Sequence, residues 1–509
     1  MSAGERLEVY GGGALPAVRR AAHTGWRALL PSWPLVMGLL AFVQTLAHPN
    51  AVLGDPDTYL HIAAGHWMFL HHALPAHDPF SYTKAGAPWI AHEWLSEIML
   101  AAVYDVGGWS GLVLLAGACF AAGAALLTRL LLRYCDPFST LIAVLLAGLL
   151  TLAHLLARPH LLALPLLVLW CGALFRARDD GAAPPLLLLP VITLWANLHA
   201  SFMFGLALAG FLAGEAVLCP APGASRRSEA RRWGMFFLAA ALAALCTPNG
   251  IAGIIQPFRL MAMPALAHIL EWQGANFQDF QPLELWLLGF AGLGFATGLT
   301  VPPARLVLVL GLCHLSLQHI RYTELLGFVG PLALAASLGA DLAEKIHRAP
   351  PSALAHAMLQ QTLPARAPAL LAVATGAVLL SLPLLLQPIT RTNNWMTPAT
   401  ALAAAAARGL LKKPVFNSYS FGGYLIFRKV PTFVDGRAEL YGNAFLADQF
   451  EAQNDRRKLA ALLHRFHVAW ALLSPQDGAA LLLDGMAGWR RIYRDRYAVV
   501  DVRAPGPSQ

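Results

Sequence analysis

The feature that most constrains this chain is a series of apolar runs, each long enough to cross a bilayer, between residues 31 and 387. A helical span needs roughly 17–25 mostly apolar residues, and only a helix or a closed barrel satisfies its backbone polar groups in lipid. The whole chain is 57% hydrophobic and 13% charged, unlike an ordinary soluble domain. We therefore predict an all-α polytopic membrane protein.

About eleven transmembrane helices can be placed in this region. Their expected ranges are 31–48, 109–132, 138–157, 160–175, 184–198, 202–219, 234–248, 284–300, 304–318, 323–341 and 368–387. Between the seventh and eighth runs, residues 248–283 hold shorter apolar pieces, which we expect to form helices lying at the membrane interface.

The distribution of Lys and Arg predicts the orientation of these helices, because short cytoplasmic segments are enriched in both residues. With a cytoplasmic N-terminus, sixteen Lys and Arg residues lie in inside segments, against four outside: Lys84, Arg158, Arg259 and Arg321. The opposite orientation would invert this ratio. The long loop 49–108 and everything after the last span are therefore expected outside, and the formal charge of +8 reflects topology rather than nucleic-acid binding.

The composition changes at about residue 388, where the last apolar run ends. Short β-type runs at 414–419, 431–435, 467–473 and 497–503 alternate with helical ones, a pattern typical of a small α/β domain. We predict two domains: a transmembrane domain over 1–387 and a C-terminal extracytoplasmic domain over 388–509.

The first outward loop carries the most unusual polar residues. Asp55 and Asp57 open it, and His61, His92 and Glu93 follow. Paired carboxylates suit a general base acting on an acceptor hydroxyl, or a pair of ligands for a divalent cation such as Mg or Mn. The alternative for Asp57 is a helix N-cap, and Glu93 is equally suited to the positive end of a helix dipole.

Other outward hairpin ends also hold ionisable residues, which are costly at membrane depth and usually line a cavity or a substrate path. These candidates are Arg158, His160, His199, Glu271, His319 and Arg321. Arginines at the membrane boundary suit a phosphate through charge-assisted hydrogen bonds, although they can also extend to lipid headgroups. The histidines can equally be packing residues. With no nucleotide-binding signature, the combination favours a lipid-phosphate sugar donor.

These residues carry a resemblance to the GT-C superfamily of integral membrane glycosyltransferases, in which an acidic residue follows the first span and a Tyr comes shortly after it, as Tyr59 follows Asp55. Longer strings resemble a bacterial membrane family associated with GT-C proteins: DPDTYLHIAAGHW, DPFSYTKAGAPWIAHEWLSE, LARPHLL, LWANLHASF and FNSYSFGGYLIF with FVDGRAELYG. The resemblance implies that Asp55 is the catalytic base. Asp57 stands one place later than the second acidic residue of the family, so its role as metal ligand, acceptor-orienting group or loop brace stays open.

We expect a glycosyltransferase, moving a hexosyl or pentosyl group from a polyprenyl-phosphate donor to an acceptor lipid, glycan or protein outside a bacterial cytoplasmic (inner) membrane. Membrane lipids are the other expected partners, and a divalent cation is an open possibility. Two alternatives belong to other classes. A transporter or flippase should show related halves and mid-membrane charges, whereas a non-catalytic envelope assembly protein should tolerate loss of the acidic pair.

Overall fold

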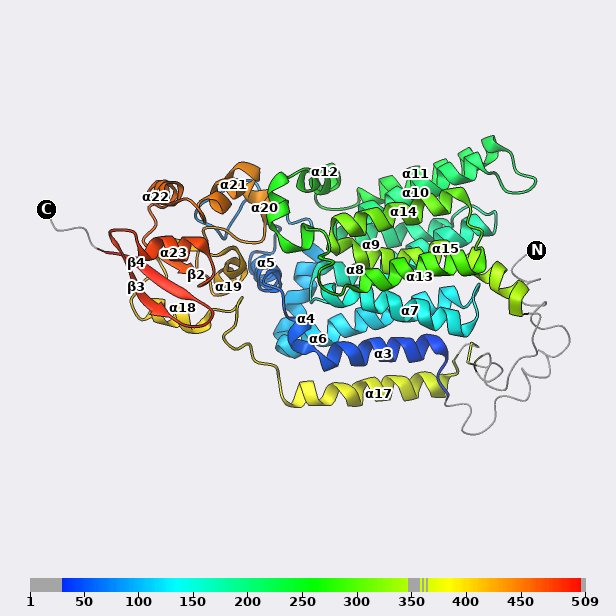
Figure 1. Cartoon of the computed structure of the whole chain (residues 1–509), viewed down its shortest axis with the longest axis horizontal. Helices are drawn as coiled ribbons and strands as arrows, with labels where there is room; N and C mark the ends of the chain where they lie inside the picture. The colour runs from blue at the N-terminus through cyan, green and yellow to red at the C-terminus, as the bar shows by residue number, and fades with distance from the viewer. Residues whose placement is uncertain (1–29, 347–357, 359–360, 363–364, 505–509) are drawn as a thin grey trace.

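The computed structural model describes residues 30–346, 358, 361–362 and 365–504. The expected cytoplasmic N-terminus therefore lies outside the described residues. Long helices run side by side along the longest axis of the molecule, and a smaller region with the sheet stands at one end of them (Figure 1). The helices of this bundle are α3 (Trp33–Ala47), α6 (Trp94–Leu131), α7 (Pro137–Thr151), α8 (Pro159–Asp179), α9 (Leu189–Leu198), α10 (Phe202–Leu218), α11 (Arg226–Ala244), α13 (Pro282–Thr297), α14 (Pro303–Gln318), α15 (Thr323–Ile346) and α17 (Ala367–Leu386).

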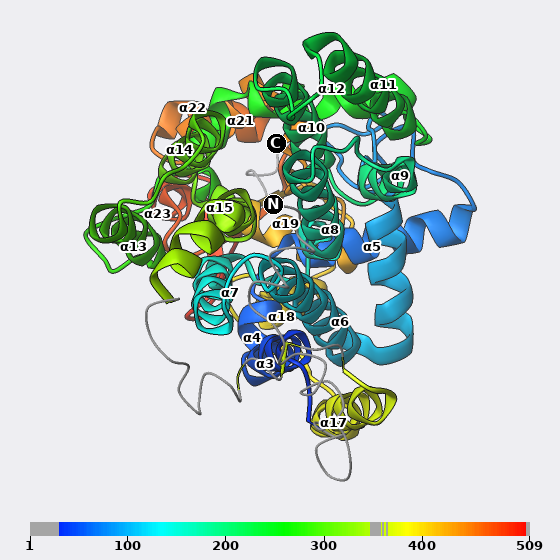
Figure 2. The same cartoon turned by 90° about the vertical axis from the view of Figure 1, so that its right-hand side faces the viewer.

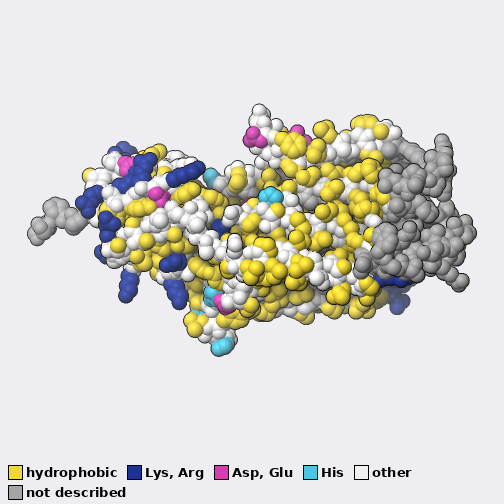
Figure 3. Space-filling view, turned by 90° about the horizontal axis from the view of Figure 1, so that it is seen from below, with side chains coloured by type: hydrophobic (Ala, Val, Ile, Leu, Met, Phe, Trp, Pro, Cys, Tyr) yellow, Lys and Arg dark blue, Asp and Glu magenta, His cyan; other side chains and the backbone are white. Residues whose placement is uncertain are grey.

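Every predicted apolar run overlaps one of these helices, so the mainly helical membrane-protein fold is confirmed. Among the described residues, five helical stretches are long and apolar enough to cross a membrane by length and composition: Trp94–Leu131, Pro137–His154, Pro159–Asp179, Ile320–Gly339 and Ala367–Leu386. Five shorter apolar helices accompany them, and the total of eleven spans stays a prediction. Apolar side chains cover the visible flank of the bundle, whereas Lys and Arg gather over the region with the sheet (Figure 3).

Helix α6 joins two predicted elements, a helix start at Glu93 and the span from residue 109. The apolar pattern predicts a span from residue 109, but the helix starts at Trp94 and continues through a kink at Gly108, whose φ of 57° only glycine adopts easily. Its first part therefore belongs to the long loop and carries loop residues into the bundle. Helix α6 packs along α3, α8 and α5 (Asp57–His71). Seen along the bundle, α8 lies among the other helices rather than at the edge (Figure 2).

The region after α17 contains a four-stranded sheet, as the predicted α/β composition requires. Its strands are β1 (Val415–Asn417), β2 (Trp470–Leu473), β3 (Trp489–Arg494) and β4 (Val499–Arg503), in the order β1-β2-β4-β3. Strands β1 and β2 are parallel, and the other two pairs are antiparallel. The helices around it are α18 (Ala399–Ala406), α19 (Gly422–Phe427), α20 (Ala438–Tyr441), α21 (Asn443–Glu451), α22 (Arg456–Arg465) and α23 (Gly478–Asp484).

Two strand predictions need correction. Residues 431–435 form no strand, because Thr432 pairs with the long loop through an isolated bridge to Ser81. Strand β3 was not predicted, since its residues are half-exposed and basic. The short apolar pieces at 248–283 do form helix α12 (Gly250–Met261) and two 3₁₀ turns, Pro264–His268 and Leu270–Trp272. Their position at a membrane interface stays a prediction, as does a domain boundary at residue 388.

The long loop is tied to the C-terminal region rather than standing free. Arg437 donates to Asp78 Oδ1 at 2.7 Å and to Asp435 Oδ2 at 2.8 Å, and its guanidinium lies 4.7 Å from the Trp89 ring centroid. All three charged groups are buried. Asp78 also accepts from the backbone N–H of Phe80, so it forms a turn as well. This ion cluster fixes the loop over the end of the bundle.

Candidate functional site

The candidate site lies where the ends of several hairpins meet the start of α5. The segment before α8 is anchored there by two hydrogen bonds. The Ala157 N–H donates to Val52 O at 2.8 Å, and Thr58 Oγ1 donates to Ala157 O at 3.2 Å. These bonds place Arg158, the next residue, against the acidic pair. The expected gathering of hairpin ends at one end of the bundle is thus seen in the structure.

Arg158 binds both members of the acidic pair and a third carboxylate. Its Nη1 donates to Asp55 Oδ2 at 3.2 Å and to Glu271 Oε2 at 2.9 Å, while Nη2 donates to Asp57 Oδ2 at 3.0 Å. We call Asp55, Asp57, Glu271 and Arg158 the acid–arginine cluster. The other oxygen of Asp55 accepts from the Asp57 N–H at 2.7 Å. Arg158 therefore orders three acids that come from two segments, the stretch at the start of α5 and the 3₁₀ turn Leu270–Trp272.

Arg321 is bound much less completely. Its Nη1 donates to Glu271 Oε1 at 3.1 Å, and its guanidinium lies 4.3 Å from the centroid of the Trp272 ring. His319 packs against the same ring and contacts Trp272 O through Nδ1 at 2.5 Å. Glu271 thus joins the two arginines, and the second one keeps unused donors beside the cluster.

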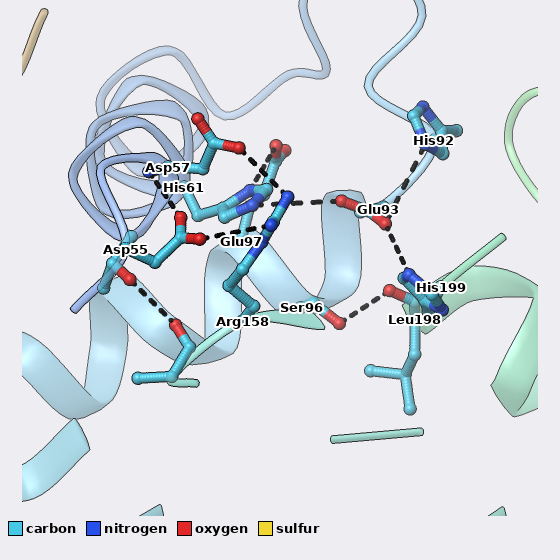
Figure 4. Close-up of polar contacts among 12 residues, drawn as sticks. Asp55, Asp57, His61, His92, Glu93, Ser96, Glu97, Arg158, Leu198 and His199 are labelled. Atoms are coloured by element: carbon cyan, nitrogen blue, oxygen red, sulfur yellow. Dashed lines mark hydrogen bonds and ion pairs between the residues drawn. The ribbon is translucent and has the colours of Figure 1, made fainter. Parts of the chain in front are cut away.

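A second group of acids and histidines surrounds Glu93 (Figure 4). Glu93 Oε1 lies 3.3 Å from His199 Nε2 and 3.9 Å from His92 Nε2, and Glu93 Oε2 lies 4.0 Å from His61 Nε2. His61 stands one helical turn after Asp57 on α5, and its Nδ1 lies 3.4 Å from Glu97 Oε1. We call Glu93, His61, His92, His199 and Glu97 the histidine–glutamate cluster. His61 connects it to the helix that carries Asp57.

His160 completes the set of predicted residues. Its Nε2 lies 2.8 Å from His154 O and 3.8 Å from Glu324 Oε2, and its ring lies 6.1 Å from that of His199. The contacts join the candidate residues into two groups: the acid–arginine cluster with Arg321 and His319, and the histidine–glutamate cluster with His160. The two groups meet on α5, which carries Asp57 and His61. The predicted site residues did not include Glu97 or Glu324. The signal for Glu97 was its place one turn after Glu93, on the helix that Glu93 was expected to open.

Burial and neighbouring charges give acids of the acid–arginine cluster different pKa values. Burial raises the pKa of the Asp57 carboxyl to about 8, against the lowering effect of Arg158. Burial would also raise the pKa of Glu271, but Arg158 and Arg321 together lower it to about 2. Asp55 accepts two N–H groups, one from the Asp57 backbone and one from Arg158. At neutral pH the cluster thus holds a protonated Asp57 and an ionised Glu271.

His61 is neutral in this environment. Burial lowers its pKa to about 4, although the nearby Glu93 carboxylate raises it. The side chain is 8% exposed, and its Nε2 has no hydrogen-bond partner. A buried imidazole nitrogen without a partner is an open position for a polar group of a ligand.

Two glycines of the C-terminal region bring that region against the acidic pair. A Cβ on Gly436 would stand 2.0 Å from Asp57 Oδ1, and one on Gly423 would stand 2.2 Å from Pro56 O. Gly423 and Gly436 belong to the GGY and DGR strings. Because they have no side chain, the backbone of the C-terminal region can reach the start of α5. The C-terminal region is therefore part of the wall around Asp57.

The fit of a divalent cation was tested on the acidic pair, where the sequence suggested one. The Asp55 and Asp57 oxygens that face the centre of the cluster both accept from the Arg158 guanidinium. No group of three or more His, Cys, Asp or Glu side chains is placed to hold a metal ion within the part of the chain that the structure describes. The residues present do not fit a metal centre in this arrangement.

An apolar groove opens on the flank of the bundle beside the histidine–glutamate cluster. It has a volume of about 810 Å³ and lies between the start of α6, α9 and the turn after α11. At its wall, Trp94 Nε1 donates to Asn197 Oδ1 at 2.9 Å. Trp94 directly follows Glu93, so the groove and the cluster share one helix start.

Solved structures share this architecture. The archaeal oligosaccharyltransferase AglB from Archaeoglobus fulgidus, in complex with an inhibitory peptide and a dolichol-phosphate, matches with a TM-score of 0.52 and 12% identity, over 87% of this chain and 69% of that one. The A. fulgidus oligosaccharyltransferase in complex with Zn and sulfate matches with a TM-score of 0.50 and 13% identity, over 92% and 73%.

ArnT from Cupriavidus metallidurans, bound to undecaprenyl phosphate, gives a lower TM-score of 0.48 at 14% identity, over 93% of this chain and 98% of that one. No protein-family profile and no curated protein sequence matches the chain. The oligosaccharyltransferase matches confirm the GT-C-like fold that the sequence resemblance implied.

Proposed function

We propose that this protein is a membrane glycosyltransferase that moves a sugar from a polyprenyl-phosphate donor to an acceptor outside the cytoplasmic membrane. The observation that carries the proposal is the partly buried acid–arginine cluster, which lies beside Arg321 at one end of a GT-C-like bundle. Arg321 gives one hydrogen bond to this cluster. The proposed setting is the bacterial inner membrane, with this end of the bundle and the C-terminal region facing the periplasm.

Asp55 is the proposed general base. It takes the proton of the acceptor hydroxyl while that oxygen forms a bond to the anomeric carbon and the bond from this carbon to the phosphate oxygen breaks. The products are the glycosylated acceptor with inverted anomeric configuration, polyprenyl phosphate and protonated Asp55. Two observations support this role: both Asp55 oxygens accept N–H groups, and the neighbouring Asp57 is held neutral by burial. A pair of carboxyl groups held in different protonation states is a recurrent acid–base arrangement.

Arg321 is the proposed ligand of the leaving phosphate. The sequence suggested both arginines for this role, but Arg158 already donates to three carboxylates. Arg321 gives one hydrogen bond to Glu271 and otherwise lies on an aromatic face. Its remaining N–H groups are suited to a phosphate. The nearby His319 and the histidine–glutamate cluster, with the open Nε2 of His61, are proposed to bind the sugar and acceptor hydroxyls.

The apolar groove beside Trp94 is the proposed position for part of the polyprenyl chain. It opens on the flank of the bundle and is mostly lined by apolar residues. The similar oligosaccharyltransferase in complex with a dolichol-phosphate carries a ligand of this class. A lipid transporter would also need such a groove. The acid–arginine cluster at the end of the bundle favours a transferase, because it supplies a carboxylate that can act as a base.

The test is sugar transfer from labelled polyprenyl-phosphate hexose and pentose donors by the purified full-length protein in detergent. Loss of label from the lipid fraction is measured with a bacterial envelope extract as acceptor. We expect label to leave the lipid with the wild-type chain and not with Asp55→Asn. The matched control is Asp105→Asn, an exposed acid on α6 that pairs with His66. The proposal fails if the wild-type chain moves no sugar from either donor, or if Asp55→Asn transfers as fast as Asp105→Asn.

A further inference from the structure

The acid–arginine cluster has a cation at its centre that belongs to the chain itself. Three carboxylate oxygens, from the loop before α5, the first residue of α5 and the 3₁₀ turn Leu270–Trp272, lie 2.9–3.2 Å from the two terminal nitrogens of Arg158. The four side chains are between 11% and 24% exposed. Acidic oxygens from separate segments that converge on one centre are the usual donor set of a hard divalent cation.

The Arg158 guanidinium occupies the centre of the cluster, at hydrogen-bond distance from all three acids. A metal ion would bind the same oxygens directly, at about 2.0–2.6 Å. The planar guanidinium instead offers several donors in a fixed fork, and Nη1 and Nη2 divide the three acids between them. A metal ion in the same place would have to displace the Arg158 guanidinium. The displaced guanidinium would then be buried without its carboxylate partners, at a high desolvation cost.

We infer that the Arg158 guanidinium is a built-in cation, which takes the place between Asp55, Asp57 and Glu271 that a divalent metal ion would otherwise occupy. The position is a property of the folded chain. Its consequence, that sugar transfer proceeds without a divalent cation in the acidic pair, rests on the proposed function. Arg158 is then a positioning residue, because it holds the base and its neighbour without contacting the sugar.

Charge balance supports the same arrangement. With Arg158 and Arg321 positive and Asp55 and Glu271 negative, the site is neutral only while Asp57 keeps its proton. If a neutral residue replaced Arg158, a divalent cation would restore neutrality with all three acids ionised. Loss of Arg158 therefore removes the cation that competes with a metal ion for the three carboxyl groups, and it leaves these groups without a positive partner.

The experiment is a Mn²⁺ titration of the metal-free, full-length protein in detergent, with free Mn²⁺ followed by electron paramagnetic resonance. We expect no stoichiometric site up to 1 mM, an order-of-magnitude limit set by weak carboxylate sites, in the wild-type chain. Arg158→Gln should gain about one Mn²⁺ per chain, with an affinity at least about tenfold higher than that of the wild type. The double variant that combines Arg158→Gln with Asp57→Asn should lose this Mn²⁺ site again. Arg321→Gln removes the same charge from the neighbouring arginine and should gain no such site.

Two results overturn the inference: a wild-type Mn²⁺ site that Asp55→Asn abolishes, or a folded Arg158→Gln chain that binds no more Mn²⁺ than the wild type. If Arg158→Gln does not fold, the wild-type titration decides alone. A site dependent on Asp55 refutes the inference, and no site up to the limit supports it. Because the readout is metal binding, the inference can stand even if no sugar transfer is found, and the transferase proposal can stand if the inference fails.

Discussion

Neutralising the two aspartates separately should give opposite results, although they stand two residues apart and share Arg158. Asp55→Asn removes the proposed base, which is worth about 10²–10⁴-fold in rate for a well-placed group. Asp57→Asn replaces a carboxyl group that is already protonated at neutral pH by a neutral group of the same shape. We expect Asp57→Asn to keep transfer at pH 7 within about tenfold of the wild type, because its loss removes no base.

The pH dependence follows from the Asp57 pKa of about 8. About nine-tenths of Asp57 is protonated at pH 7 and about one-tenth at pH 9. Ionisation adds a negative charge beside the position proposed for the donor phosphate and competes with Asp55 for Arg158. The kcat/KM of the wild-type chain should therefore fall about tenfold between pH 7 and pH 9, whereas that of Asp57→Asn should stay level.

The assay is the initial rate of label transfer from the polyprenyl-phosphate sugar, measured from pH 6 to pH 9 for both variants and the wild type. Folding is checked by gel filtration in the same detergent. A wild-type rate that rises through pH 8, together with an inactive Asp57→Asn, would make Asp57 the base and refute the assignment. Equal losses in both variants would refute the separation of roles.

Three further changes probe other parts of the site. Arg321→Gln should raise the KM for the donor by about 10–100-fold, the equivalent of a charged hydrogen bond of about 1.5–3 kcal/mol. The control, Arg259→Gln on the exposed face of α12, should leave the KM unchanged. Equal KM values for the two variants would show that Arg321 does not bind the donor phosphate. Cys246→Trp fills the apolar groove and should raise KM for a long-chain donor more than for a short-chain one; its control is Cys219→Trp, at another exposed cysteine. Arg437→Leu leaves Asp78 and Asp435 buried without their partner and should destabilise the chain by about 3–5 kcal/mol in thermal or denaturant unfolding, whereas exposed Arg408→Leu should change stability little.

The helices of the bundle can be predicted from the sequence because the apolar residues that specify a membrane helix are contiguous in the chain. Each apolar run carries its own helix, and starts such as α7 carry their own cap, where Asp136 accepts two backbone N–H groups ahead of Pro137. The hairpin ends that hold Arg158, His199 and Arg321 could therefore be placed together from the alternation of spans alone. A helix start at Glu93 could be predicted, but its continuation into the span was missed because the first turns of α6 are mixed in polarity.

Pairings between distant segments could not be predicted in the same way. The sequence suggested that Arg158 binds a phosphate, but its three carboxylate partners lie about a hundred residues away. Nothing local to Arg158 distinguishes it from Arg321, which keeps free donors at the same end of the bundle. The same holds for Thr432, whose local β-type pattern is overridden by its pairing with the long loop.

Gly436 tests whether the C-terminal region takes part in the site or only covers it. An added Cβ would meet Asp57 Oδ1 at 2.0 Å, a separation that two non-bonded atoms cannot keep. Either the Asp57 carboxyl turns away from Arg158, or the turn that carries Gly436 moves off α5. We expect Gly436→Ala to lower sugar transfer at pH 7 more than Asp57→Asn does. The added methyl group displaces the Asp57 carboxyl, whereas Asp57→Asn only neutralises it. Because Asp57 and Asp55 share Arg158, the displacement should disturb both of these residues. Gly214→Ala on α10, where a Cβ meets nothing within 4 Å, is the control. If Gly436→Ala transfers sugar like that control, the wall around Asp57 has room to adjust, and the C-terminal region need not be held this close for the base to work.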